Sequence, residues 1–384
     1  MRQPESNEGD DPVIRTMAVV GTGLIGTSVA LAARRGGVAV HLLDADEANA
    51  ATAVALGAGV LGPPREPVDL AVLAVPPSAV VTVLAEQRAR HLAEVYTDVA
   101  SVKGAVARAG EAPGDFIGGH PLAGRERSGP LASRADLFEG RPWVLAPSPE
   151  TPTPVLNRVL ELVSMCAAIP VLMGSQDHDA AVALTSHVPH LVASLTAARL
   201  QGGSHDALRL AGQGLRDVTR IAAGDPRLWA DILQANALGV ATVLRELTGD
   251  LARVLAALDE LAAVGPTDAE ESAKTLVEVL EQGVAGLDRI GPRTARPGPH
   301  VQLRVSVGGR PGELARLLAA LTESGITADD LTPVHSQRQG TLAVLFAVPL
   351  APARRVIAGL SEEGWQAEIW DPQTAPRTPT GCGS

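Results

Sequence analysis

Short apolar runs alternate with longer stretches of helical apolar spacing along the first 174 residues of the chain. The runs have the length and composition of strands in a parallel sheet whose two faces are both covered. They fall at residues 17–20, 38–43, 69–75, 95–99, 116–119, 143–146 and 169–173. This alternation predicts an α/β domain with a doubly wound sheet over residues 15–174.

The pattern changes at residue 175, and strand signals do not return until about residue 300. Four long stretches rich in Ala and Leu have helical spacing, at residues 177–201, 206–221, 226–259 and 267–289. Helices this apolar usually bury one face against a partner. We therefore expect an all-α domain over residues 175–290 that binds the substrate and forms the interface of a homodimer.

A segment rich in Pro, Gly and Arg at residues 291–299 predicts a linker. Beyond it, the order strand, helix, strand, strand, helix, strand predicts a small ferredoxin-like α+β module over residues 300–371. Its predicted strands are 301–307, 330–335, 342–348 and 366–370, and its helices are 311–324 and 352–363. We expect residues 1–14 and 372–384 to be disordered.

Composition and charge narrow the class of protein. With 46% hydrophobic and 20% charged residues, the chain can build a packed core. A net charge of −11 argues against nucleic acid as the main partner. We expect no membrane segment, since no uncharged apolar run looks long enough. The two cysteines fit a reducing cytoplasm and exclude a disulfide framework or a cysteine zinc site, and no metal is predicted.

Gly21, Gly23 and Gly26 follow the first predicted strand with the spacing G-x-G-x-x-G, and a predicted helix follows at 27–35. The first glycine makes a tight turn, the second lets the backbone approach a pyrophosphate, and the third lets the helix pack on the strand. The pyrophosphate would bind free N–H groups at the helix N-terminus. This loop, with Leu24 and Ile25, predicts a cofactor site in a Rossmann-type domain.

Asp44 ends the second predicted strand, eighteen residues after Gly26. A carboxylate in this place can hydrogen-bond the adenosine ribose hydroxyls of a dinucleotide. The sequence Asp44-Ala45-Asp46 offers no Arg for a 2′-phosphate, which favours NAD over NADP. The alternative for Asp44 is a helix N-cap.

Two polar side chains, Ser101 and His120, follow neighbouring predicted strands. Ligands of doubly wound sheets bind at the carboxyl ends of the strands. A histidine held by a serine partner can keep one tautomer and accept a proton from a substrate hydroxyl. We therefore predict that His120 is a catalytic base, with a turn-capping role as its alternative.

The stretch 186–190, Ser-His-Val-Pro-His, places His187 and His190 one helical turn apart. A metal pair is disfavoured, because no nearby ligand completes the site. A cation or hydrogen-bond donor for a carboxylate fits better, and a helix cap beside a proline kink is the alternative.

Arg220 lies among apolar residues near a predicted helix end. A partly buried arginine requires an anionic partner, which is either Asp217 or a substrate carboxylate. The remaining histidines are predicted to be surface or cap residues without a role: His41, His91, His178, His205, His300 and His335.

Over residues ~15 to ~290 the chain resembles the prephenate dehydrogenase family, which includes arogenate-using relatives. The resemblance rests on separated motifs in a fixed order: the glycine loop, 98–104, 119–129, 186–190, 217–221, Asp225-Pro226 and Trp229. It implies that His120 hydrogen-bonds the ring hydroxyl of the substrate and that Ser101 orients His120. It also implies substrate contacts for four further residues: Arg220, His190, Glu126 and Trp229.

The resemblance implies oxidative decarboxylation of prephenate with NAD. Arogenate, which carries an amine in place of the side-chain keto group, is the alternative substrate, and Glu126 keeps it open. An alternative of another class is an inactive NAD-bound amino-acid sensor. The intact His120, Ser101 and Arg220 argue against that sensor.

The C-terminal module resembles an ACT domain, which implies an amino-acid ligand; tyrosine is our hypothesis. The loop 308–314 keeps the Arg-Pro-Gly-x-Leu shape of such domains. Gly309 and Thr327 stand where Asp and Asn are usual, so an oligomerisation role without a ligand remains the alternative.

Overall fold

The computed structural model describes residues 14–108, 114–123, 129–264 and 270–290. In the C-terminal part it describes 300–307, 313, 316–317, 320–321, 326, 332–336 and 341–370. The chain forms two compact units, which divide between Ala252 and Arg253. The predicted terminal segments beyond Ile14 and Trp370 and the predicted linker 291–299 lie outside the described residues.

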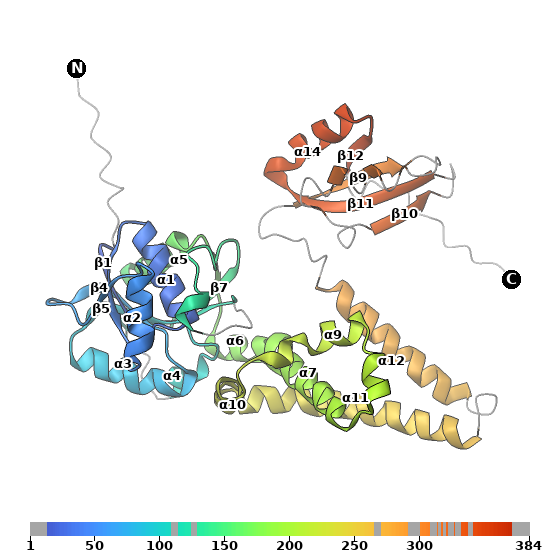
Figure 1. The fold of residues 1–384 in the computed structure, drawn as a ribbon, viewed down its shortest axis with the longest axis horizontal. Coiled ribbons are helices and arrows are strands. Elements are labelled where there is room, and N and C mark those ends of the chain that lie inside the picture. The colour runs from blue at the N-terminus through green and yellow to red at the C-terminus, as the bar shows by residue number, and fades with distance from the viewer. Residues whose placement is uncertain are drawn as a thin grey trace. The chain divides into compact units, whose positions relative to one another are not determined.

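The first unit is built on an eight-stranded sheet (Figure 1). Its order is β3-β2-β1-β4-β5-β6-β7-β8, and all neighbouring strands are parallel except the antiparallel pair β6 and β7. The first six strands have the Rossmann order. The strands are β1 (Thr16–Val20), β2 (Ala39–Leu43), β3 (Val60–Leu61), β4 (Val68–Leu73), β5 (Ala93–Asp98), β6 (Phe116–Pro121), β7 (Pro142–Ala146) and β8 (Ile169–Leu172).

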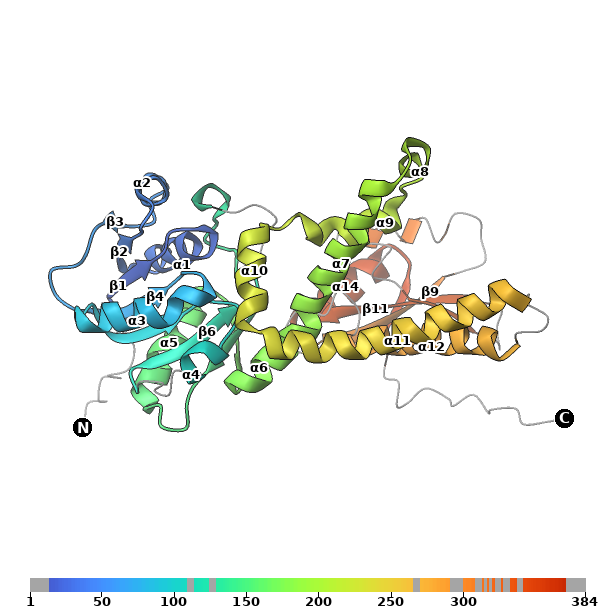
Figure 2. The same ribbon diagram turned by 90° about the horizontal axis from the view of Figure 1, so that it is seen from below.

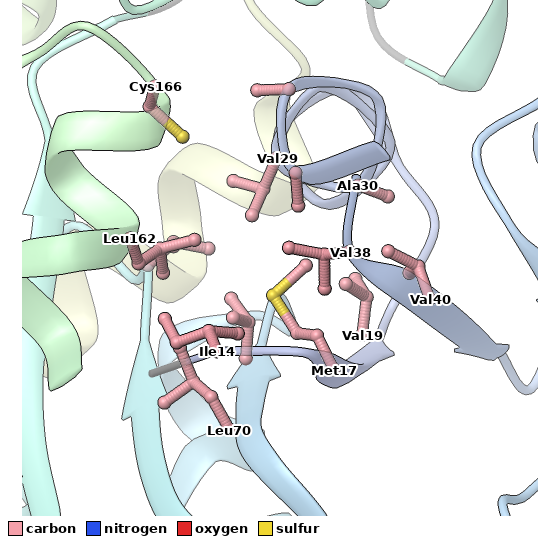
Figure 3. Packing of buried hydrophobic residues seen from close by; sticks show 14 of the residues in the cluster. Ile14, Met17, Val19, Val29, Ala30, Val38, Val40, Leu70, Leu162 and Cys166 are labelled. Carbon is pink, nitrogen blue, oxygen red and sulfur yellow. The ribbon is translucent and has the colours of Figure 1, made fainter. Parts of the chain in front are cut away.

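Helices cover both faces of this sheet, as the alternating pattern predicted. On one face, α1 (Leu24–Arg35) and α5 (Thr153–Met165) pack on an aliphatic core. Figure 3 shows Val29 of α1 and Leu162 of α5 near Met17 of β1. On the other face lie α3 (Val80–Ala89) and α4 (Gly104–Arg108). The remaining elements of this part of the chain are α2 (Glu47–Ala55), η1 (Pro77–Ala79) and η2 (Pro130–Ala132).

Helices follow the sheet from Ser175 onward. They are α6 (Ser175–Val182), the π-helical turn η3 (Ala183–His187), α7 (Val188–Arg199), η4 (Leu200–Gly202), α8 (His205–Arg209), α9 (Gln213–Thr219), η5 (Arg220–Ala223), α10 (Pro226–Ala235), α11 (Ala237–Val264) and α12 (Glu270–Asp288). Within the first unit, Val188 of α7 packs with Val240 of α11.

Two of the long helices predicted from the sequence are interrupted. The predicted helix 206–221 is divided into α8, α9 and η5. The predicted helix 226–259 breaks at Asn236, which ends α10 with φ −113° and ψ 31°. The buried Asn236 amide donates to the Asp179 carbonyl oxygen (2.7 Å), so a distant hydrogen bond accompanies the break.

The continuous helical segment Ser175–Gly202 is long and apolar enough to cross a membrane by length and composition, with a mean hydropathy of 1.2. No such run was predicted from the sequence. Three histidines on this segment are buried in the unit: His178, His187 and His190. In all, 33% of the apolar window is buried within the described chain.

The second unit contains the end of α11, helix α12 and a four-stranded antiparallel sheet (Figures 1 and 2). An ion pair joins Arg253 of α11 to Glu278 of α12 (3.6 Å). The sheet has the order β10-β11-β9-β12, and its core includes Leu303, Phe346 and Trp365. Its elements are β9 (His300–Val307), β10 (Thr332–Ser336), β11 (Thr341–Pro349), α14 (Leu350–Glu362) and β12 (Gln366–Trp370). The predicted helix 311–324 lies only partly within the described residues.

Candidate active site

A cavity of about 770 Å³ lies at the carboxyl ends of the central strands in the first unit. One wall is the glycine loop, a second comes from the segments after β4, β5 and β6, and a third comes from α6, η3 and α10. Its lining residues are 23–26, 74–77, 99–101, 120–123 and 129, with Val182, Thr185, Ser186, His187, Leu228, Trp229 and Ile232. The loop predicted to bind a cofactor and the residues predicted to carry chemistry therefore share one space.

The glycine loop has the geometry that its spacing predicted. Gly21 has φ +99°, a conformation that side chains disfavour. A Cβ on Gly26 would lie 1.9 Å from the Gly21 carbonyl oxygen, so the close approach of helix to loop requires glycine. Leu24 and Ile25 line the cavity. The backbone cradle fits a dinucleotide pyrophosphate at the start of α1.

Asp44 lies beside this loop, and its carboxylate accepts hydrogen bonds from Thr22. The Thr22 backbone N and Oγ1 lie 2.5 and 2.7 Å from Asp44 Oδ2. The cap of helix α2 is Asp46, whose side chain accepts from the Ala48 N–H at 2.9 Å. Asp44 is therefore not the cap of this helix, and its carboxylate is held at the edge of the glycine loop.

Ser101 and His120 both line the cavity, as expected from their places after β5 and within β6. Ser101 was predicted to be the partner of the His120 ring. The hydrogen bond that the structure gives this ring joins His120 Nδ1 to His178 Nε2 at 2.8 Å. The two histidine rings meet edge to face, with centroids 5.1 Å apart.

The prediction that His178 is a surface or cap residue is wrong, because its side chain is 0% exposed. His178 Nδ1 lies 2.9 Å from Asp179 Oδ1, so His178 connects His120 to a carboxylate. Asp179 also accepts the backbone N–H groups of Lys103 and Gly104, at 2.7 and 2.8 Å. A signal was present in the sequence, since His178, Val182 and Ser186 share one helix face.

A buried ion pair lies behind His120. Lys103 Nζ donates to Asp98 Oδ1 and, at 2.6 Å, to the carbonyl oxygen of Gly119. The Gly119 N–H donates to Asp98 Oδ1 at 2.8 Å. A Cβ on Gly119 would lie 2.6 Å from the Asp98 carbonyl oxygen, which explains the glycine before His120. The pair therefore joins the ends of β5 and β6 and fixes the backbone at His120.

The pKa of His120 lies well below its ordinary value. Burial is the largest cause, and electrostatic repulsion from His178, Lys103 and His187, whenever these groups are protonated, acts in the same direction. His120 is therefore neutral near pH 7, as a residue that accepts a proton must be.

His187 lines the cavity and is also buried. Its Nδ1 lies 3.1 Å from the Asn236 amide nitrogen. Burial lowers the pKa of His187 to about 4. Because the amide nitrogen also donates to the Asp179 carbonyl oxygen, the His187 Nδ1 is an acceptor and its proton is on Nε2. His187 was named in the sequence analysis only as half of a histidine pair, and its place in the cavity wall is a result of the structure.

His190 and Trp229 form one stacked pair. Their rings lie 3.5 Å apart and are inclined by 11°. Trp229 lines the cavity, whereas His190 is not among the described lining residues. A Cβ on Gly224 would lie 2.4 Å from Trp229 Nε1, so the indole is closely held on that side too. His190 thus supports the wall that Trp229 presents.

Arg220 is exposed on η5, against the expectation of partial burial. The break of the predicted helix 206–221 explains the difference, since α9 and η5 carry no fully buried residue. Asp217, the alternative partner, accepts from the Gln213 amide at 2.9 Å. Arg220 is not among the described lining residues of the cavity, and Glu126 lies outside the described residues. The substrate contacts of both residues stay predictions.

Two family models match most of the chain. Residues 29–172 match the nucleotide-binding domain of prephenate dehydrogenase, and residues 174–282 match its dimerization domain. The boundary between them coincides with the change from sheet to helices near residue 175.

Individual relatives agree with the models. The probable prephenate dehydrogenase NovF of Streptomyces niveus is 38% identical, over 92% of this chain and 99% of its own length. The solved prephenate dehydrogenase of A. aeolicus, in complex with hydroxyphenyl propionate and NAD+, is 27% identical with a TM-score of 0.62, over 72% of this chain and 98% of its own. Synechocystis arogenate dehydrogenase is 27% identical with a TM-score of 0.59, over 72% and 99%. The chain belongs to the prephenate dehydrogenase family.

Proposed function

We propose that the protein catalyses the NAD-dependent oxidative decarboxylation of prephenate to 4-hydroxyphenylpyruvate, a step of tyrosine biosynthesis. The observation that carries the proposal is the shared cavity, in which a neutral, half-buried histidine, His120, faces the same space as the glycine loop. The relatives named above include a prephenate dehydrogenase with bound NAD+.

In this proposal the glycine loop holds the pyrophosphate, and Asp44 hydrogen-bonds the adenosine ribose. His120 accepts the proton of the ring hydroxyl, and Ser101 helps to orient the reacting groups. Bound NAD supplies the hydride acceptor, and the ring carboxylate leaves as carbon dioxide while the ring becomes aromatic. The residues of the chain therefore bind, orient and accept one proton.

Four residues are proposed to bind the substrate: Arg220, His190, Glu126 and Trp229. Trp229 gives the cavity a flat apolar wall, and His190 holds that wall from behind. The planar Arg220 side chain can bind a carboxylate through two parallel hydrogen bonds. Arg220 is exposed on η5, so a carboxylate can reach its guanidinium group from solvent.

The test is NADH formation by the purified protein with prephenate and with arogenate, each with NAD and with NADP. We expect turnover with prephenate and NAD. Turnover with arogenate alone would support the second candidate, which the similarity to Synechocystis arogenate dehydrogenase favours. NAD binding without turnover of either substrate would support an inactive sensor instead.

We further propose that the C-terminal sheet is an ACT-like module and that the protein is a cytoplasmic homodimer. The sheet order places the first and third strands of the module at its centre, as in ferredoxin-like folds. Exposed apolar side chains along α11 and α12 offer an interface: Leu255, Leu258, Val277, Leu280, Val284 and Leu287. Tyrosine is the proposed effector. Of the loop 308–314 predicted to bind it, the structure describes only Glu313.

The effector proposal is tested by titrating activity with tyrosine, on the full chain and on a chain shortened to residue 290. Inhibition of the full chain alone supports a tyrosine site in the module. Equal inhibition of both chains would place the effect in the active site, and no inhibition would leave the module a structural role.

A further inference from the structure

We propose that His178 and Asp179 form a proton relay behind His120, which fixes the tautomer of His120 and takes up the charge when His120 accepts the substrate proton. The inference rests on the proposed role of His120 as the base. It assigns a function to two residues that contact His120 or its partner from helix α6. The relay follows from two hydrogen bonds, His120 Nδ1 to His178 Nε2 (2.8 Å) and His178 Nδ1 to Asp179 Oδ1 (2.9 Å).

The direction of the relay is set at Asp179. Burial by itself would raise the pKa of this carboxyl, but hydrogen bonds from His178, Lys103 and Gly104 outweigh it, and the pKa lies below its ordinary value. An ionised carboxylate has no proton to donate. The proton of the Asp179–His178 hydrogen bond therefore belongs to His178 Nδ1.

The remaining protons follow in order. A neutral His178 with its proton on Nδ1 has a lone pair on Nε2, so Nε2 must accept from His120. His120 then carries its proton on Nδ1 and has a lone pair on Nε2. The structure assigns this lone pair to the base, because His120 lines the cavity and its Nδ1 is already engaged.

The proton balance is simple. The substrate hydroxyl gives one proton to His120 Nε2, and the proton on His120 Nδ1 moves to His178 Nε2. His120 becomes neutral again, and the positive charge comes to lie on His178, 2.9 Å from the Asp179 carboxylate. Within the relay only these N–H and O–H bonds change, and the proton returns by the same path to the ring oxygen when the aromatic product forms.

The charged groups around His120 disfavour a positive charge on its ring, so a partner that takes up this charge stabilises the protonated state. Lys103 and His187 both disfavour positive charge at His120, and Asp98 is engaged with Lys103. Among the groups that face the two histidines in the described chain, Asp179 is the anion in direct contact with the relay. Moving charge from His120 to His178 therefore places it next to a carboxylate, 2.9 Å from Asp179 Oδ1.

The first test measures the tautomers directly, in the full native chain without substrate. Proteins labelled with nitrogen-15 histidine, natively and with His178→Gln for assignment, are compared by NMR near neutral pH. We expect His120 and His178 each to carry the proton on Nδ1. A proton on His120 Nε2 would overturn the relay, whether or not the protein turns over prephenate.

The second test separates proton transfer from positioning. The amide of His178→Gln can still accept from His120 Nδ1 but cannot take up a proton, whereas His178→Leu removes both functions. We expect kcat to fall about 10- to 100-fold in His178→Gln, less than for loss of the base itself. KM for prephenate should stay within about twofold, and the acidic limb of kcat/KM should move to lower pH because the charge no longer reaches Asp179.

The matched control is Asp177→Asn, one residue earlier on the same turn and exposed, which should leave kcat and the pH profile unchanged. A folded His178→Gln protein with native kcat and pH profile would overturn the proposal. Should His178→Gln fail to fold, the tautomers in the native chain still decide. An inactive native enzyme would instead contradict the proposed function.

Discussion

Replacing His187 should make the protein less sensitive to acid. His187 is 1% exposed, and burial lowers its pKa from 6.5 to about 4. Between these two values the unfolded chain binds a proton that the folded chain does not. The stability contributed by neutral His187 is therefore present above about pH 6.5 and is lost as the pH falls towards 4.

The magnitude follows from the shift, at about 1.4 kcal/mol for each pKa unit. Between about pH 7.5 and about pH 5, this one histidine should lower the free energy of unfolding by about 2 kcal/mol. The variant His187→Asn removes the titrating ring, while its side-chain oxygen can still accept from the Asn236 amide. His120 and His190, whose pKa values are also lowered by burial, remain in both proteins and cancel in the comparison.

Urea-induced unfolding at the two pH values gives the free energies. His187→Asn should be less stable than the native protein at about pH 7.5, because a smaller side chain leaves space in the wall. Between about pH 7.5 and about pH 5, the free energy of unfolding of His187→Asn should fall by about 2 kcal/mol less than that of the native protein. His205→Asn replaces an exposed histidine and is the matched control. Its free energy of unfolding should change between the two pH values as much as that of the native protein. Equal losses in His187→Asn and the native protein would refute the burial argument.

Three further predictions concern the proposed reaction. His120→Asn should lower kcat about 100- to 10,000-fold with NAD affinity nearly unchanged, and near-native turnover would reject His120 as the base. Arg220→Gln should raise KM for prephenate about 10- to 100-fold with a smaller change in kcat, while Arg227→Gln at another exposed arginine should not. Loss of folding in Arg220→Gln would indicate a structural role instead. The native protein should prefer NAD because Asp44 repels a 2′-phosphate, and a measured preference for NADP would contradict that assignment.

Local patterns predicted the elements that depend on neighbours in the sequence. The strands of the parallel sheet and the turn at Gly21 follow from apolar runs and glycine spacing, and both are confirmed. Strand β3 was not predicted from the apolar pattern, because it has only two residues, Val60 and Leu61, and both are exposed. The antiparallel pairing of β6 with β7 was not predicted either, since an apolar run does not reveal the direction in which its strand pairs with a neighbour.

The features that the sequence did not predict depend on distant partners. His178 meets His120 across 58 positions, and Asn236 meets Asp179 across 57. Residue type alone placed His178 with the surface histidines; its spacing from Val182 and Ser186 indicates a shared helix face, but does not reveal the partner 58 positions away. The breaks near Asn236 and at the π-helical turn likewise place side chains in the site, at the expense of the regular helices that their composition favours.

The base His120 and its partner His178 come from opposite sides of the boundary near residue 175, and Asp179 holds the two sides together. Its carboxylate accepts the N–H groups of Lys103 and Gly104, which follow strand β5, while its own helix carries His178. If α6 left the sheet, these buried donors would lose their acceptor, at about 1–3 kcal/mol for each group. The same contact that docks the helical domain on the sheet therefore also orients His120. For this reason the chemistry depends on the joined domains, and neither the glycine loop nor the histidine cluster can supply it separately.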